Sequence, residues 1–341
     1  MADNLDNLLK ATSRSFYLTL RVLPGAIRPQ ISLAYLLART ADTIADTELV
    51  PPEQRIDALK RLRERIQGTS TAPLNLYTLA QQQGSAAEKL LLEKIEDSLA
   101  LLPTLSHADQ PLVRSVLNTI TGGQELDLRR FAAASAEKIV ALETAAQLDD
   151  YTYRVAGCVG EFWTKLCRAH LFPTRRLDDP QLLADSVRFG KGLQLVNILR
   201  DLPADLRKGR CYLPSDQLER AGLLPEVLLS PANAAKFRPL FHEYLDRAES
   251  HLAAGWAYTN TLPFGQVRVR LGCALPILIG VKTIERLRAS SVLDLQQRVK
   301  VPRNEVRGIG LRLILLYPLP RVWRTSFPTG GKAVASGGKL A

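Results

Sequence analysis

Apolar residues recur every three to four positions through most of the chain, which is the spacing of amphipathic α-helices. No stretch alternates convincingly between apolar and polar residues, so we expect no β-strand. Proline residues interrupt the pattern and mark helix ends. The pattern predicts an all-α protein in which residues 68–83 form a polar loop with short structure at most. The expected helices cover about 27–47, 53–67, 85–102, 109–121, 136–170, 180–201, 234–259 and 266–290.

One predicted helix is apolar on almost every side between residues 31 and 46. Its polar residues form a single stripe, Tyr35, Arg39, Asp42 and Asp46, at steps of four, three and four. A helix that is apolar on most sides is buried, so this stripe is expected to line an internal cavity.

A second segment repeats this pattern. Gln194, Asn197, Asp201 and Asp205 share one face of a helix, while aliphatic residues cover its other faces. We expect this second stripe to lie opposite the first.

The two aspartate pairs carry the chemistry of these stripes. A spacing of four places both carboxylates of a pair on one helix face, one turn apart. One such pair alone is more often a solvated surface stripe. Two copies, each with an arginine close by, favour a cage of oxygen ligands for Mg²⁺ bound to a diphosphate. The sequence therefore predicts an enzyme that binds and ionises diphosphates.

The formal net charge of +11 requires an explanation. Nucleic acid is one partner of basic proteins, but the basic residues are spread out and no recognised binding motif accompanies them. We expect no nucleic-acid partner, because a positive field that attracts diphosphates and anionic lipid explains the same charge. The four cysteines lack metal-ligand spacing and resemble reduced core residues of a cytoplasmic protein.

Residues 308–323 are apolar, with Arg307 before them and Arg324 after them. The segment is either a last core helix, ended by its two prolines, or an interfacial anchor at the inner face of the membrane. The sequence leaves both interpretations open. It contains no run of about 20 apolar residues that would span a bilayer, and its acidic first residues do not resemble a signal peptide.

No linker divides the chain. We expect one domain over residues 1–323, a helical bundle around a central cavity, in a monomeric protein. Residues 324–341 are too poor in hydrophobic side chains to pack and are expected to form a disordered tail.

Four segments in order resemble the squalene/phytoene synthase family: SRSFYLTLRVLP (13–24), DTIAD (42–46), YTYRVAGCVGE (151–161) and LQLVNILRDLPADLRKGRCYLP (193–214). The resemblance extends over roughly residues 10–305. It implies a single all-α isoprenoid-synthase domain. It also implies that two farnesyl diphosphate molecules are joined head to head through a cyclopropyl diphosphate intermediate.

The resemblance implies roles for individual residues. Asp42, Asp46, Asp201, Asp205 and Asn197 match the Mg²⁺–diphosphate positions, and Asp42, Asp201 and Tyr151 match catalytic ones, Tyr151 being the residue that assists proton removal or cation steering. The substrate-binding set comprises Ser13, Arg14, Ser15, Phe16, Tyr35, Arg39, Gln194, Asn197, Arg200 and Arg210. Val155 joins this set because it begins a run of small residues that would let a long chain pass close to the backbone.

The chain departs from the family pattern at three positions. Ala45 and Ala204 stand where the family often has an acidic residue. Pro203 falls inside the second motif, where proline removes a backbone donor and is expected to kink the helix while leaving Asp205 in reach.

The stretch QQRVKVPRNE (296–305) resembles the family segment implicated in nicotinamide or diphosphate binding, so Arg298, Lys300 and Arg303 are the expected NADPH contacts. The DTxxD and SRSF motifs resemble squalene synthases more than phytoene synthases. We therefore favour NADPH-dependent formation of squalene. A phytoene or dehydrosqualene synthase, a chain-elongating prenyltransferase or terpene cyclase, and a non-catalytic lipid-binding or assembly partner remain alternatives.

Overall fold

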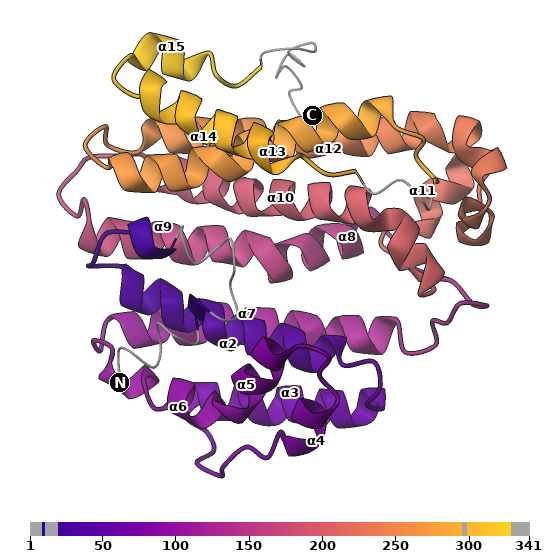
Figure 1. The fold of residues 1–341 in the computed structure, drawn as a ribbon, viewed down its shortest axis with the longest axis horizontal. Coiled ribbons are helices and arrows are strands. Elements are labelled where there is room, and N and C mark those ends of the chain that lie inside the picture. Colours follow the sequence, from indigo (N-terminus) through magenta and orange to yellow (C-terminus); the bar gives the residue numbers. More distant parts are fainter. Residues whose placement is uncertain (1–8, 11–19, 295–298, 329–341) are drawn as a thin grey trace, which may run out of the picture.

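Layers of roughly parallel and antiparallel helices make up the computed structural model, which describes residues 9–10, 20–294 and 299–328 (Figure 1). The first half contains α2 (Arg28–Asp46), α3 (Pro52–Gln67), α4 (Tyr77–Gln81), α5 (Ala86–Glu93), α6 (Ile95–Leu99), η1 (Leu102–Thr104), α7 (Asp109–Arg130), β1 (Val140–Ala141), α8 (Ala145–Thr152), the π-helical turn η2 (Tyr153–Gly157) and α9 (Cys158–His170). The second half contains α10 (Asp179–Arg207), β2 (Arg210–Cys211), α11 (Ser215–Arg220), η3 (Pro225–Leu229), η4 (Pro231–Asn233), α12 (Ala234–Thr261), α13 (Val267–Ala289), α14 (Arg303–Leu316) and α15 (Pro320–Arg324).

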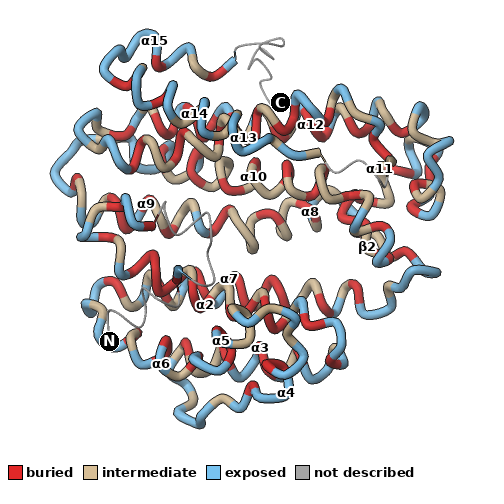
Figure 2. The backbone as a smooth tube through the Cα atoms, in the orientation of Figure 1, coloured by how far each residue is buried: buried red, intermediate tan, exposed pale blue. Residues whose placement is uncertain are grey.

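Each layer packs on the next. Both α2 and α3 contact α7, which contacts α9, and α9 contacts α10; α12, α13 and α14 follow in turn. Buried positions face between the layers and exposed positions face outward (Figure 2). One hydrophobic cluster surrounds α2, α3, α7 and α9, and a second surrounds α10, α12 and α13. The prediction of an all-α helical bundle is confirmed.

Several helix boundaries differ from the predicted ones. The helix expected at 85–102 is divided into α5, α6 and η1, with a break at Lys94. The helix expected to end at residue 121 continues to Arg130. Its Gly123 packs so closely on the next layer that a Cβ atom there would lie 2.8 Å from the Cβ of Arg154. Gly123 therefore allows two helices to pack closely and does not end the helix.

The segment before residue 145 is not helical, contrary to the prediction of a helix from 136. Its β1 pairs in parallel with β2, so that Val140 lies opposite Arg210. The chain reaches β2 through Gly209, which has a φ of 75°. A Cβ at that position would lie 2.2 Å from the Ser135 carbonyl oxygen, so both the turn and the contact require glycine.

Helix α10 runs through Pro203 without interruption and ends only at Arg207. The expected kink does not divide the helix. Asp201 and Asp205 consequently share one element.

The C-terminal segment forms α14 and α15. The predicted boundary of the disordered tail at residue 324 is wrong, because Phe327 is buried and stacks on Trp256. Residues 329–341 lie outside the described part of the chain. All four cysteines are buried and free, as expected. Within the described ranges, no helix combines the length and hydropathy needed to cross a bilayer.

Candidate active site

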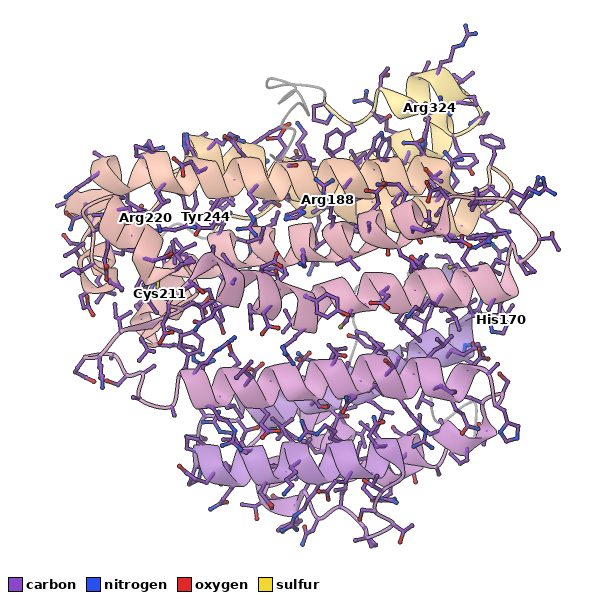
Figure 3. All side chains as sticks on the ribbon, turned by 180° about the vertical axis from the view of Figure 1, so that it is seen from behind. His170, Arg188, Cys211, Arg220, Tyr244 and Arg324 are labelled. Carbon is purple, nitrogen blue, oxygen red and sulfur yellow. The ribbon has the colours of Figure 1, made fainter. Side chains whose placement is uncertain are left out.

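A cavity of about 290 Å³ opens between α2, α7, α8 and α10. Most of its walls are polar side chains from segments far apart in the sequence. The lining residues are Asp42, Ala45, Asp46, Gln124, Asp127, Leu128, Tyr151, Val155, Gln194, Arg210 and Tyr212. The segment after α10 supplies Arg210 and Tyr212. Cys211, which lies between them in the sequence, is at the opposite end of the bundle from His170 (Figure 3).

Helix α2 contributes the first aspartate pair. Its apolar residues, including Leu36 and Leu37, are fully buried and fix the helix against α7 and α3. This orientation turns Asp42 and Asp46 into the cavity. Asp42 accepts a hydrogen bond from the Gln124 side-chain amide of α7. Burial, followed by the charge of Asp46, raises the pKa of Asp42 to about 7.

Arg39, one turn before Asp42, does not line the cavity. Its guanidinium donates to Glu88 of α5 at 2.6 Å, and both side chains are one-third exposed. Arg39 still lowers the pKa values of Asp42 and Asp46 through its charge. Arg39 is therefore close to the aspartates but held by a carboxylate of a neighbouring helix.

Helix α10 contributes the second pair in a different setting. Asp201 is bound by its sequence neighbour Arg200 through two hydrogen bonds, of 2.9 and 2.5 Å. Burial and the charge of Asp201 raise the pKa of Asp205 to about 7, whereas Arg210 and Lys208 lower it. Among the described residues, no arginine forms a comparable hydrogen-bonded ion pair with Asp205.

Two basic side chains influence a carboxyl of each aspartate pair. Arg210 and Lys208 lower the pKa of Asp46 from the first motif as well as that of Asp205 from the second. Asp127 raises the pKa of Asp205. The basic residues after α10 therefore act on Asp46 of α2 and on Asp205 of α10, which places these two carboxylates close together.

Two stacked tyrosines form one wall of the cavity. The rings of Tyr151 and Tyr212 are 4.6 Å apart at their centroids, with planes inclined by 27°. Tyr212 donates its hydroxyl hydrogen to Asp127 at 2.9 Å. Burial raises the pKa of Tyr151 well above its usual value, and Asp127 raises it further. Both phenols are therefore protonated at neutral pH.

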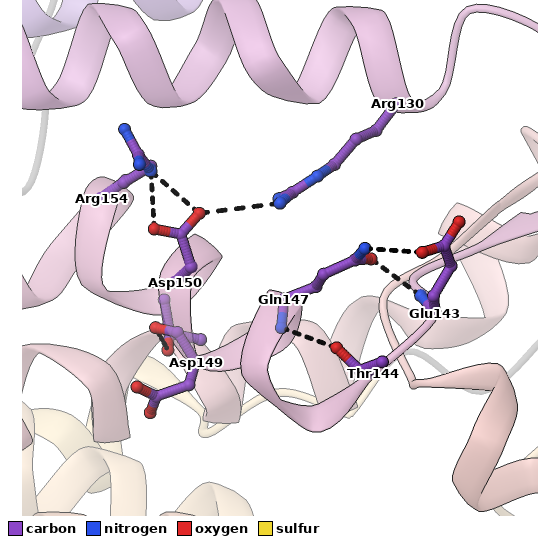
Figure 4. Close-up of polar contacts among 8 residues, drawn as sticks. Arg130, Glu143, Thr144, Gln147, Asp149, Asp150 and Arg154 are labelled. Atoms are coloured by element: carbon purple, nitrogen blue, oxygen red, sulfur yellow. Dashed lines mark hydrogen bonds and ion pairs between the residues drawn. The ribbon is translucent and has the colours of Figure 1, made fainter.

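Asp150, the sequence neighbour of Tyr151, forms ion pairs with two arginines (Figure 4). Asp150 accepts two hydrogen bonds from Arg154, at 2.8 and 2.9 Å, and pairs with Arg130 of α7 at 3.6 Å. Thr144 caps the start of α8 by accepting from the Gln147 backbone amide. These contacts fix the short helix α8, which carries Tyr151, to α7.

The small residues near Tyr151 pack helices together more than they line the cavity. Val155 faces the cavity. Gly160, in contrast, packs on α10, where a Cβ would lie 2.0 Å from the Ser186 carbonyl oxygen. Gly190 of α10 packs equally closely on Ala156. The expected passage for a prenyl chain therefore has Val155 on its wall, while these glycines bring the helices into contact.

The predicted site residues occupy four kinds of position. Asp42, Asp46, Tyr151, Val155, Gln194 and Arg210 line the cavity. Tyr35, Asn197, Arg200, Asp201 and Asp205 occupy the same two helices without being part of that lining. Lys300 and Arg303 are exposed at the start of α14. Ser13, Arg14, Ser15, Phe16 and Arg298 lie outside the described residues.

Sequence reasoning missed three lining residues, Gln124, Asp127 and Tyr212. The first two lie three positions apart on α7, beyond the predicted end of that helix, so their shared face was not considered. Tyr212 belongs to a segment that matched the family, but nothing in its local pattern distinguished it from a core tyrosine. Its stacking on Tyr151 is a tertiary contact.

The donor set suits a metal ion that arrives with a substrate. Among the residues that the structure describes, no three His, Cys, Asp or Glu side chains are gathered into a metal-binding group. Mg²⁺ typically takes one or two carboxylates and completes its shell with phosphate oxygens and water. One buried oxygen of Asp127 has no hydrogen-bond partner, and burial raises the pKa of this carboxyl to about 6. Asp127 is therefore a buried carboxyl that is only partly satisfied by the described residues around it.

The fold and the cavity define an all-helical protein with a polar cavity beside two aspartate-bearing helices. The family model for squalene/phytoene synthases matches residues 9–305. The chain belongs to the squalene/phytoene synthase family.

The similar proteins include both phytoene synthases and squalene synthases. A bifunctional lycopene cyclase/phytoene synthase from Phaeosphaeria nodorum is 30% identical over 76% of this chain and 43% of that protein. The squalene synthase of Schizosaccharomyces pombe is 26% identical over 91% of this chain and 64% of that protein. The chain thus spans between about two-fifths and two-thirds of these relatives.

Solved structures share the fold. A TcSQS–ligand complex superimposes with a TM-score of 0.75 at 23% identity, covering 95% of this chain and 91% of that one.

Proposed function

We propose that the protein joins two farnesyl diphosphates head to head to presqualene diphosphate and then reduces this intermediate to squalene with NADPH. The observation that carries the proposal is a cavity lined by the first aspartate pair, a stacked tyrosine pair and Gln194 of α10, with Asp205 close enough for Arg210 to lower its pKa. The family and its relatives support diphosphate chemistry. The choice of squalene over another product rests on the resemblance of the DTxxD and SRSF motifs.

The carboxylates of Asp42, Asp46, Asp201 and Asp205, with the Asn197 amide, would hold Mg²⁺ together with the substrate diphosphate. When bound, Mg²⁺ supplies Lewis-acid activation of the leaving diphosphate. Burial, followed by the charge of the neighbouring aspartate, raises the pKa values of Asp42 and Asp205. These raised values support the role, because a bound cation would stabilise the ionised form of both carboxyls.

Basic residues would bind the diphosphate oxygens that remain. Arg210 lines the cavity, whereas Arg39 and Arg200 are held by Glu88 and Asp201. A diphosphate entering the site would compete with these two carboxylates for their arginines. Exchange of one anionic partner for another keeps each guanidinium neutralised before and after binding.

Tyr151 would orient the cationic carbon chain and assist in removing its proton. The electron-rich face of a phenol ring stabilises a nearby cation. The hydroxyl of Tyr151 is hydrogen-bonded to that of Tyr212, which donates to Asp127. A proton accepted by Tyr151 would therefore be relayed through Tyr212 to Asp127, whose carboxyl has a pKa of about 6.

NADPH would be recognised through Lys300 and Arg303, with Arg298 from the undescribed stretch. Lys300 and Arg303 are exposed at the start of α14 and not in the cavity lining. This position, and the 30% identity to phytoene synthases, favour a second candidate: a phytoene or dehydrosqualene synthase that releases its product without reduction. We further propose that the protein is a cytoplasmic monomer; light scattering tests the monomer, and cell fractionation tests the location.

Product analysis tests the proposal. Purified protein would be incubated with Mg²⁺ and labelled farnesyl diphosphate, with and without NADPH, and the products separated by chromatography. Presqualene diphosphate or a dehydrogenated C30 product is expected without NADPH, and squalene with it. Identical products under both conditions would assign the protein to the second candidate. The absence of any prenyl product would instead indicate a non-catalytic lipid-binding or assembly protein.

A further inference from the structure

The outer face of α14 and α15 carries a row of exposed aliphatic side chains. Their exposed fractions are large for residues of this kind, and on α14 they recur at helical spacing along one face. The row consists of Leu311 (59%), Ile314 (58%), Leu315 (64%), Leu319 (53%) and Val322 (45%). Single exposed aliphatic residues are ordinary, but a continuous row on a soluble surface usually marks an interaction site.

This row is exposed because the opposite face of the same segment is attached to the bundle. Leu313, Tyr317 and Trp323 are buried there. The Tyr317 hydroxyl donates to the Phe264 carbonyl at 2.5 Å, and the Trp323 indole donates to Asn260 at 3.0 Å. The segment therefore cannot rotate to bury its outer row without losing these contacts.

A buried arginine strengthens the attachment. Arg270 of α13 lies against the rings of Tyr317 and Trp323, at 5.4 and 5.7 Å from their centroids. Trp256 of α12 stacks on Trp323 at 5.4 Å and donates to the Arg324 carbonyl at 3.1 Å. Cation–π and stacking contacts of this kind fix α15 on α12 and α13.

Charge on the outer face has one sign. Arg307, Arg312, Arg321 and Arg324 are exposed around the aliphatic row, and none pairs with a carboxylate within the described ranges. The only acidic residue of α14, Glu305, is already bound to Arg286 at 2.5 Å. The partner of this face must therefore be apolar in its interior and anionic at its surface.

We propose that the outer face of α14–α15 docks on a lipid bilayer that carries anionic headgroups. The aliphatic row would enter the boundary between headgroups and acyl chains, and the four arginines would remain at headgroup level. A second copy of this chain fits less well, since symmetric pairing of this face would bring the same arginines together.

The docking face is separate from the candidate active site. Arg324 lies at the end of the bundle away from Cys211, whose sequence neighbours Arg210 and Tyr212 line the cavity (Figure 3). None of the residues that line the cavity belongs to α14 or α15, so docking through these helices would not cover them. The proposal goes beyond the enzymatic one, because it requires no turnover and is measured without substrate.

Vesicle sedimentation tests the proposal with the full chain. Wild-type protein is expected to sediment with phosphatidylglycerol–phosphatidylcholine vesicles at low salt and to be released as salt screens the arginines. The variant Leu311→Ser/Leu315→Ser should lower the partition coefficient by about tenfold, because two buried aliphatic chains are lost. The matched control Leu49→Ser/Leu224→Ser removes two equally exposed leucines elsewhere (76% and 57%) and should bind as wild type.

A charge variant provides an independent test. Arg312→Gln/Arg321→Gln should weaken binding and reduce its salt dependence, whereas Lys60→Gln/Arg61→Gln on α3, at the other end of the stack, should not. Equal binding by the Leu311/Leu315 variant and its control would overturn the proposal. No binding by wild-type protein would also overturn it. A dimer that Leu311→Ser/Leu315→Ser dissociates, without vesicle binding by wild-type protein, would assign the face to a second copy.

Discussion

The aspartate pairs of α2 and α10 have the same spacing but different electrostatic surroundings. The first member of the α10 pair, Asp201, is neutralised by Arg200 from its own helix. The first member of the α2 pair, Asp42, has only the neutral amide of Gln124, and its pKa rises to about 7. The arginine of α2, Arg39, is paired instead with Glu88.

This difference shows that a motif repeated in sequence need not be repeated in charge state. In the α10 pair the first carboxylate, Asp201, is neutralised by its own helix, whereas in the α2 pair burial raises the pKa of the first carboxyl, Asp42; the second α10 carboxyl, Asp205, also has a pKa raised to about 7. We therefore expect Asp42 to respond more strongly to protons and to Mg²⁺ than Asp201, the corresponding residue of α10. The predictions for Asp42, Asp201 and Glu88 test this difference between the two aspartate pairs, and the prediction for Tyr151 tests the neighbouring tyrosine.

Loss of activity is the largest expected effect. Asp42→Ala and Asp201→Ala should each lower turnover by roughly 10³-fold or more, because each removes a proposed metal ligand. The two variants should differ in stability: Asp42→Ala relieves like-charge repulsion and raises the melting temperature, whereas Asp201→Ala leaves Arg200 unpaired and lowers it. Turnover and thermal melting on the same preparations measure both effects, with the exposed Asp57→Ala as control.

Tyr151→Phe should have the next largest effect. The variant keeps the ring that stacks on Tyr212 but deletes the hydroxyl. If this hydroxyl takes part in proton removal, turnover falls by roughly 10²-fold, the usual scale for a general acid–base group. The melting temperature should change little. Unchanged turnover with a stability loss of about 1 kcal/mol would instead make Tyr151 a core residue.

Stability should depend on pH through Asp42. Its folded-state pKa, about 7, exceeds the ordinary value of 3.8, so the folded protein binds more protons between these two values. The stabilising effect of protonation is therefore gained as pH falls through 7 and is absent at pH 8. Asp42→Asn keeps the acceptor for Gln124 and removes the charge. It should raise the free energy of unfolding at pH 8 by about 1 kcal/mol or more, since each pKa unit corresponds to about 1.4 kcal/mol.

The control for this pH effect is Asp201→Asn, which removes a charge that Arg200 already neutralises. Its stability at pH 8 should not exceed that of wild type. Chemical denaturation at pH 5.5 and pH 8 gives the comparison. Equal gains in both variants would show that the two pairs are electrostatically alike.

Glu88→Gln should produce the smallest effect. It releases Arg39 from an ion pair whose side chains are one-third exposed and whose strength is about 1 kcal/mol or less. Mg²⁺–pyrophosphate should then bind about threefold more tightly, as measured by calorimetry. A neighbouring variant, Glu93→Gln on the same helix, serves as the control. Weaker binding by Glu88→Gln would show that Glu88 supports Arg39 instead of competing with the ligand.

Sequence periodicity predicted most of the fold because the helices are long and their apolar faces are regular. It failed where tertiary contacts decide the boundary. Gly123 of α7 looks like a helix end but packs against Arg154, and the segment before α8 looks helical but pairs with β2. Pro203 likewise looks disruptive, yet α10 continues through it.

The candidate site was predictable from spacing where it follows a helical stripe, and from the family resemblance at Tyr151 and Arg210. Asp42, Asp46 and Gln194 were found because spacing alone places them on cavity-facing sides. Asp127 and Tyr212 were missed, since their importance comes from a hydrogen bond between segments distant in sequence. The pairing of Arg39 with Glu88 was equally invisible, because no local pattern links α2 to α5.

The two-residue ladder between β1 and β2 has a consequence for folding. Helices form from local contacts, but Arg210 and Tyr212 reach the cavity only after the chain beyond α10 pairs with Val140 and Ala141. Closing such a long loop is slower than forming a helix. The bundle should therefore assemble first and the diphosphate site last, so that a nearly folded chain remains unable to bind its ligand until this short ladder closes.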